Sequence, residues 1–203
     1  MKHVLVIKSS LQGEHGNSSI AAERYIQANY ADSDVTIARL DLSAIDLPHL
    51  TAQEMQAWST PESERNKEQK ALAARSESFI DDLNKADDIV FAVPMYNFAI
   101  PSTLKAYFDR IARAGITFKY TENGPEGLIK HKNVTVLAAR GGMYQGTPLD
   151  TQSEYVKNFL AFLGMSEVKF HYIEGLAMGE EAASNAWQKF SSQISEPNTA
   201  LEH

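Results

Sequence analysis

The sequence predicts an α/β fold in which one parallel sheet of five strands is covered by helices on both faces. Five short apolar runs alternate with five segments of helical periodicity. Such alternation is typical of βαβ units joined by right-handed crossovers. The 203 residues contain no internal repeat and no break in composition. We therefore expect a single domain over residues 1–200.

The predicted strands are continuous aliphatic runs, as expected for strands buried on both faces. They span residues 4–7, 35–40, 89–93, 134–138 and 168–173. The predicted helices span residues 18–29, 68–83, 102–113, 155–163 and 180–192. Five strands in a chain of this length favour the flavodoxin-like order 2-1-3-4-5 over the six-stranded dinucleotide-binding fold.

Three segments lie outside this pattern. Residues 43–66 hold Pro48, Trp58 and Pro61 without sustained periodicity, so we expect a long loop with a functional or partner-contacting role. Residues 118–127 carry an Asn-Gly turn signal and predict an irregular excursion. Residues 201–203 resemble the start of a vector-encoded histidine tag and are left out of the functional interpretation.

Composition excludes several classes of function. The formal net charge is −7, which disfavours general nucleic-acid binding because clustered Lys and Arg must neutralise phosphates. The absence of cysteine excludes disulfides and thiolate catalysis, and it fits a cytoplasmic protein. No stretch has the apolar length of a signal peptide or a membrane helix. The six histidines lack metal-ligand spacing and no G-x-S-x-G occurs, so we expect neither a metal site nor a catalytic nucleophile.

The loop between the first strand and the first helix has the composition of an anion site. It contains Ser10, Asn17 and Ser18, and a helix N-terminus presents free N–H groups to a negative ligand. The loop has neither G-x-G-x-x-G nor G-K-[ST], so a small phosphate monoester suits it better than a dinucleotide or a nucleoside triphosphate. The alternative is that these side chains only cap the helix.

Two further loops are expected at the same edge of the sheet. Residues 95–98 follow the third strand and residues 139–142 follow the fourth. Gly141 and Gly142 allow close approach of the backbone to a flat ligand, and Arg140 could offset negative charge. Each loop alone could be an ordinary turn. The three together favour a flat heteroaromatic ring with a phosphate tail, and FMN fits best.

Several motifs resemble those of a known family, the FMN-dependent NADH-azoreductases, also described as FMN-dependent NADH:quinone oxidoreductases. The similarity covers nearly the whole chain, and PMYNF at 94–98 together with YTENGPEGL at 120–128 is a specific combination. The motifs are PMYNF at 94–98, YTENGPEGL at 120–128, KAYFD at 105–109, ARAG at 112–115 and RGG at 140–142.

The resemblance implies a flavodoxin-like homodimer that binds FMN non-covalently near the subunit interface. It implies FMN contacts at Ser10, Gly16, Asn17, Ser18, Met95, Tyr96, Asn97, Phe98, Ala139, Arg140, Gly141 and Gly142. It also places Tyr120 and Phe162 near the flavin face where substrates stack, with Phe162 coming from the other subunit. The family often has Ser at positions 16 and 139, so here Ser10 and Ser18 are expected to make the side-chain phosphate contacts.

The resemblance implies a two-step reaction. NADH passes hydride to flavin N5 and leaves, and then a quinone or an azo compound takes the same place and is reduced. The alternatives are a flavodoxin-like electron carrier without small-molecule turnover and a module without a cofactor. The physiological acceptor and the choice between NADH and NADPH stay open.

Overall fold

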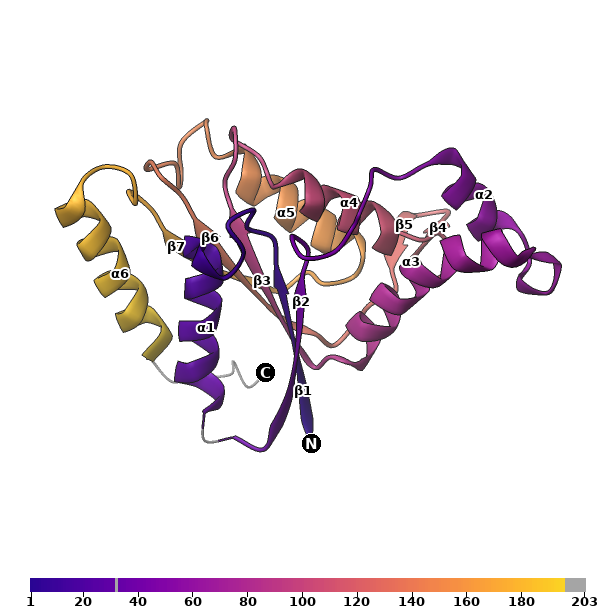
Figure 1. Ribbon diagram of the computed structural model, residues 1–203, viewed down its shortest axis with the longest axis horizontal. Coiled ribbons are helices and arrows are strands. Elements are labelled where there is room, and N and C mark those ends of the chain that lie inside the picture. Colours follow the sequence, from indigo (N-terminus) through magenta and orange to yellow (C-terminus); the bar gives the residue numbers. More distant parts are fainter. Residues whose placement is uncertain (32, 196–203) are drawn as a thin grey trace.

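The computed structural model describes residues 1–31 and 33–195, and a five-stranded parallel sheet forms its centre. Its strands are β1 (Lys2–Lys8), β2 (Val35–Asp41), β3 (Asp88–Pro94), β6 (Asn133–Ala139) and β7 (Val168–Ile173). They are ordered β2-β1-β3-β6-β7, so the predicted order 2-1-3-4-5 is confirmed (Figure 1). The predicted tag remnant at 201–203 lies outside the described residues.

Helices cover both faces of the sheet, as predicted (Figure 1). Helices α1 (Asn17–Tyr30) and α6 (Glu180–Ser195) pack on one face, where Val4 and Val6 of β1 belong to their core. Helices α3 (Lys67–Lys85), α4 (Ser102–Ile111) and α5 (Thr151–Phe162) pack on the other face, with Leu5 and Ile7. Because successive side chains of a strand point to opposite faces of the sheet, β1 contributes to both hydrophobic cores.

The segment 43–66 is more ordered than the sequence indicates. It contains helix α2 (Ala52–Ser59) and the short 3₁₀ helix η2 (Glu62–Glu64), so the expectation of one long loop is wrong there. The Thr51 side chain caps α2. The buried Glu54 carboxylate accepts bonds of 2.9 and 2.7 Å from Arg110 of α4. A helix this short is stabilised mainly by such tertiary contacts, which leave no periodicity to read.

Residues 118–127 form a β-hairpin rather than an irregular excursion. Strands β4 (Phe118–Thr121) and β5 (Gly124–Gly127) pair antiparallel. The hairpin rests against the C-terminal end of α5, where a Cβ at Gly127 would lie 2.0 Å from the Gly164 nitrogen. In the view of Figure 1 it lies on the same side of the molecule as α3, away from the loops that follow β1, β3 and β6.

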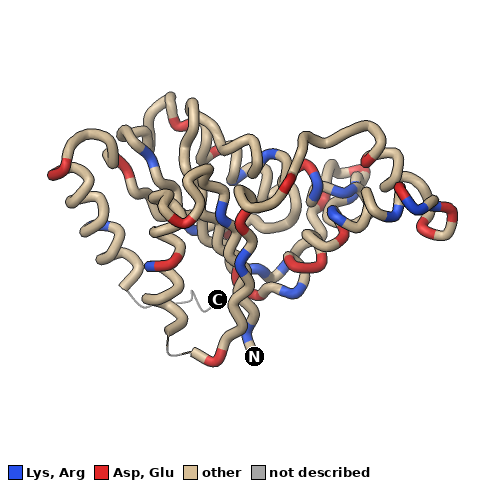
Figure 2. The backbone as a smooth tube through the Cα atoms, in the orientation of Figure 1, with Lys and Arg blue, Asp and Glu red and all other residues tan. Residues whose placement is uncertain are grey.

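Charged residues are interspersed by sign rather than segregated, which Figure 2 shows along α3. Within 1–31 and 33–195, none of the helices has the length and apolar character needed to cross a bilayer. The same residues contain no group of three or more His, Asp or Glu side chains arranged to hold a metal ion.

Candidate functional site

A cavity of about 210 Å³ lies at the carboxyl ends of β1, β3 and β6. Its lining comes from all three predicted loops and from the segment after β7. The lining residues are Ser10, Gln12, Asn17, Pro94, Met95, Tyr96, Ala139, Arg140, Gly141, Leu176 and Ala177. The structure therefore brings together Ser10, Asn17, Met95, Tyr96, Ala139, Arg140 and Gly141 from the predicted set. Gln12 and Pro94 also lie in the predicted loops, although they are absent from the predicted set of FMN contacts. Leu176 and Ala177 were missed, because only their place after β7 brings them to this edge.

The N-terminus of α1 is open toward an anion. Its N-cap residue is Gly16, which supplies no side-chain cap, so the alternative that Ser and Asn side chains merely cap this helix is not observed. Ser18 is fully buried, and its hydroxyl has no hydrogen-bond partner within the described residues. Free N–H groups and an unpaired hydroxyl at one helix end are the features that a phosphate would satisfy.

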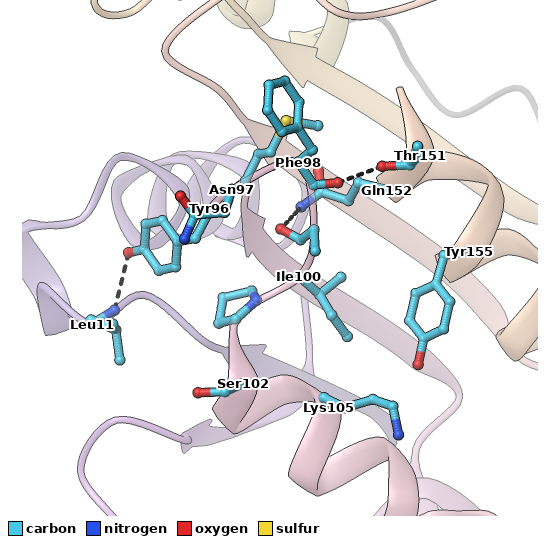
Figure 3. A pocket seen from close by; sticks show the side chains of 13 residues that line it. Leu11, Tyr96, Asn97, Phe98, Ile100, Ser102, Lys105, Thr151, Gln152 and Tyr155 are labelled. Atoms are coloured by element: carbon cyan, nitrogen blue, oxygen red, sulfur yellow. Dashed lines mark hydrogen bonds between the residues drawn. The ribbon is translucent and has the colours of Figure 1, made fainter. Parts of the chain in front are cut away.

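Tyr96 joins the first loop to the loop after β3. Its hydroxyl lies 3.3 Å from the Ser10 hydroxyl and accepts a bond of 3.2 Å from the Leu11 N–H (Figure 3). A Cβ at position 16 would lie 2.0 Å from the same Ser10 oxygen. With Ser10 in this position only glycine fits at 16, which explains why this chain has no serine side chain there.

Lys8 is a charged residue of this loop region that sequence reasoning did not single out. Its side chain is 3 % exposed, its ammonium pairs with Glu14, and it lies 3.6 Å from a carboxylate oxygen of Glu23. The pair with Glu14 ties the end of β1 to the 3₁₀ helix η1 (Gly13–His15). The available signal was a lysine that ends an otherwise apolar, buried strand.

The loop after β3 is a tight turn in an unusual conformation. Tyr96 and Ala99 exchange two backbone bonds of 3.0 Å. Between them Asn97 and Phe98 have φ values of 50° and 64°. Two successive left-handed residues are uncommon without glycine. Each such backbone conformation costs about 1–3 kcal/mol and persists only where contacts with the surrounding structure fix it. The conformation therefore depends on neighbouring elements.

A second, larger cavity of about 980 Å³ lies against the same turn (Figure 3). Met95 and Tyr96 line both cavities, so the turn forms their shared wall. The larger cavity is also lined by Leu11, Asn97, Phe98, Ala99, Ile100, Pro101, Ser102, Lys105, Thr151, Gln152 and Tyr155. This largely apolar and aromatic lining suits a flat ligand.

The positive charge of Arg140 is paired with carboxylates inside the protein. Its guanidinium is fully buried and pairs with Asp150 at 2.8 Å and Glu174 at 3.0 Å. Burial by itself raises the pKa of Asp150, but bonds from Arg140 and Ser153 outweigh it and hold the pKa below its ordinary value. The interpretation that Arg140 offsets the charge of a ligand is therefore corrected. Its main-chain N–H is also occupied, because it donates to the Ile173 carbonyl at 2.8 Å, so Arg140 lines the cavity without offering a free donor.

Gly141 and Gly142 are held with their N–H groups free. Their carbonyls accept bonds of 2.9 and 3.0 Å from the N–H groups of Ala177 and Gly175. Their own N–H groups have no acceptor in the part of the chain that the structure describes. The loop after β6 therefore leaves two backbone donors unpaired, and Gly141, which carries the first of them, lines the smaller cavity.

Tyr120 and Phe162 do not line either of these two cavities. Both rings contact Phe118, with centroid distances of 5.5 Å for Tyr120 and 4.3 Å for Phe162. Tyr120 is 75 % exposed. The predicted substrate-stacking residues thus lie together, Tyr120 in the hairpin and Phe162 at the end of α5, apart from the three loops of the same chain.

Comparison with known proteins agrees with this arrangement. The sequence matches a family model described as a flavodoxin-like fold over residues 2–196. It is 57% identical over 196 residues to an FMN-dependent NADH:quinone oxidoreductase of Alteromonas mediterranea, covering 97% of this chain and 98% of the relative. The chain belongs to the FMN-dependent NADH:quinone oxidoreductase family. The predicted family is therefore confirmed.

Solved azoreductase structures are similar as well. An azoreductase from Bacillus anthracis strain Sterne superposes with a TM-score of 0.85 at 28% identity, covering 97% of this chain and 100% of that chain. An FMN-dependent NADH-azoreductase from B. anthracis strain Ames Ancestor, solved in complex with FMN, has a TM-score of 0.85 at 25% identity, covering 96% and 98%.

Proposed function

We propose that this protein is an FMN-dependent NADH:quinone oxidoreductase that also reductively cleaves aromatic azo compounds. The observation that carries the proposal is the meeting of three loops at one cavity. The open helix N-terminus and the buried Ser18 hydroxyl suit the phosphate of FMN. The Tyr96–Ala99 turn and the free N–H groups of Gly141 and Gly142 suit its ring. The relatives named above support the cofactor and the electron donor.

The residues of the chain would bind and orient the reactants rather than take part covalently. FMN, when bound, would supply the redox chemistry by accepting hydride from NADH and returning reducing equivalents to an acceptor. The unpaired N–H groups of Gly141 and Gly142 would donate to the polar end of the bound ring and would stabilise negative charge there. The aromatic and apolar walls of the larger cavity select flat molecules by shape. NADH and the acceptor would therefore use one place in turn.

The electron count separates the two acceptor classes. Reduction of a quinone to a hydroquinone takes two electrons and two protons, so it consumes one NADH. Cleavage of an azo bond to two amines takes four electrons and four protons, so it consumes two. The tolerant apolar walls place few specific demands on either acceptor, which supports a common site.

We further propose that the active form is a homodimer in which a second copy supplies Tyr120 and Phe162. Within one chain both rings pack on Phe118 of the hairpin, apart from the cavities. The exposed Tyr120 ring and the apolar cavity are complementary surfaces for a two-fold contact. A cytoplasmic location is proposed with it, on the ground that a chain without cysteine needs no oxidising compartment.

The test starts from the purified protein and FMN. We expect uptake of FMN, loss of the visible flavin absorption on anaerobic addition of NADH, and its return when a quinone or an azo dye is added. Steady-state rates with NADH and a quinone should give parallel double-reciprocal lines. Failure to take up FMN would refute the proposed function. Intersecting double-reciprocal lines would refute the proposal that NADH and the quinone share one binding site.

A further inference from the structure

Gln152 makes hydrogen bonds to both loops that flank the proposed ring site. It is the second residue of α5 and is 2 % exposed. Its amide nitrogen donates to the carbonyls of Pro94 at 2.8 Å and Ala99 at 3.0 Å. Its amide oxygen accepts a bond of 3.2 Å from Nε of Arg140. One buried side chain therefore connects β3, β6 and α5, and no donor hydrogen is left over.

The bonds from α5 hold the turn in its left-handed conformation. Gln152 binds carbonyls just before and within the turn, at Pro94 and Ala99. The neighbouring Thr151 hydroxyl donates to the Phe98 carbonyl at 2.6 Å (Figure 3). The carbonyls of Pro94 and Ala99 flank the residues of positive φ, and the third belongs to Phe98, which is one of them. Such a conformation persists only where its surroundings fix it, and the start of α5 supplies that constraint.

Through Arg140 the same contacts reach the loop that carries Gly141 and Gly142. Arg140 is fixed by Asp150 and Glu174, and Glu174 also accepts bonds of 2.9 Å from the N–H groups of Tyr144 and Gln145. The segment that follows the two glycines is thereby anchored to the same buried network. A change at Gln152 would uncouple the two loops while the ion pairs of Arg140 remain.

We infer that Gln152 is a positioning residue that sets the relative placement of the Tyr96–Ala99 turn and the Gly141–Gly142 loop, and thereby the binding geometry of FMN. This inference rests on the proposed function. It assigns Gln152 no contact with the reacting atoms. The expected signature is a change in the environment of bound flavin, which loss of fold stability alone would not produce.

The experiment compares Gln152→Glu and Gln152→Leu with the wild-type protein loaded with FMN. Both changes remove the two amide donors, and the carboxylate of the first faces two carbonyl oxygens. We expect the Kd for FMN to rise about tenfold, the size of one or two lost buried hydrogen bonds. We also expect a shifted flavin midpoint potential and an altered visible circular dichroism spectrum of the bound flavin. Thr151→Val should change the same readouts in the same direction by less.

Ser76→Ala is the matched control. Ser76 is fully buried and donates to the Arg110 carbonyl at 2.6 Å, yet it lines neither cavity. Its loss should lower the melting temperature and leave the flavin potential and spectrum unchanged. Wild-type Kd and spectra in both Gln152 variants would overturn the inference, as would equal shifts in Ser76→Ala. If neither Gln152 variant folds, an unchanged potential and spectrum in Thr151→Val overturns it. Wild-type protein that takes up no FMN would instead refute the proposed function.

Discussion

Ser18 has a buried hydroxyl that meets no partner among the described residues, and this makes its role measurable. In the cofactor-free protein the unsatisfied hydroxyl is a cost, so Ser18→Ala should leave the free energy of unfolding unchanged or raise it by up to about 1 kcal/mol. If the hydroxyl binds the phosphate of FMN, its loss removes a bond to a charged group, about 1.5–3 kcal/mol. The Kd for FMN should then rise roughly ten- to hundredfold.

Riboflavin, which has no phosphate, is the internal control for this prediction. Fluorescence titration should show an unchanged Kd for riboflavin in Ser18→Ala. An equal loss of affinity for both ligands would mean that the hydroxyl shapes the ring site instead. A destabilised cofactor-free protein with wild-type FMN affinity would contradict the assignment outright.

At the level of single residues, the sequence predicts which positions reach the cavity better than it predicts what their side chains do. Parallel strands end at one edge, so strand ends alone bring Ser10, Met95 and Gly141 together. The guanidinium of Arg140 is different because its direction is set by Asp150 and Glu174, which follow at 10 and 34 residues' distance along the chain. No local sequence pattern indicates which residues will pair with a side chain at such distances along the chain.

Helix α2 shows the same limit for an element. Glu54 is almost fully buried against the guanidinium of Arg110, which is itself inaccessible to solvent. Removing one partner of a buried pair leaves an uncompensated charge, so Glu54→Ala should lower the free energy of unfolding by about 3–5 kcal/mol. Urea denaturation of the cofactor-free protein measures it. FMN affinity should stay at the wild-type value, because α2 lines neither of the two cavities.

Glu62→Ala, in the adjacent η2, is the control for this prediction. Glu62 is exposed, so its loss should change the stability by less than about 0.5 kcal/mol. A loss below about 1 kcal/mol in Glu54→Ala would show that α2 is held by its apolar contacts alone. The buried pair also explains why the sequence predicts a loop at 43–66, since the partner that anchors α2 lies 56 residues away.

For the whole molecule, the regular part of the fold could be predicted and the additions to it could not. Buried strands alternating with amphipathic helices specify the sheet, its order and its two covered faces. The β4–β5 hairpin is too short to show period-two alternation, since two of the four residues in β5 are glycines. It nevertheless carries Tyr120, which the proposed dimer places at the active site.

The last prediction tests that dimer by mixing two defective variants. Ser18→Glu should exclude FMN phosphate from its own loop by charge repulsion, and Phe162→Ser should remove the stacking ring from the hairpin region. If the ring serves the other subunit, a mixed dimer contains one site in which the intact loops of the Phe162→Ser chain meet the intact Phe162 of the Ser18→Glu chain. NADH:quinone activity should therefore appear on mixing under conditions that exchange subunits, while each variant alone stays inactive.

If Phe162 serves its own chain, both sites of the mixed dimer stay defective and no activity returns. A protein that sediments as a monomer at working concentration would contradict the dimer before any mixing.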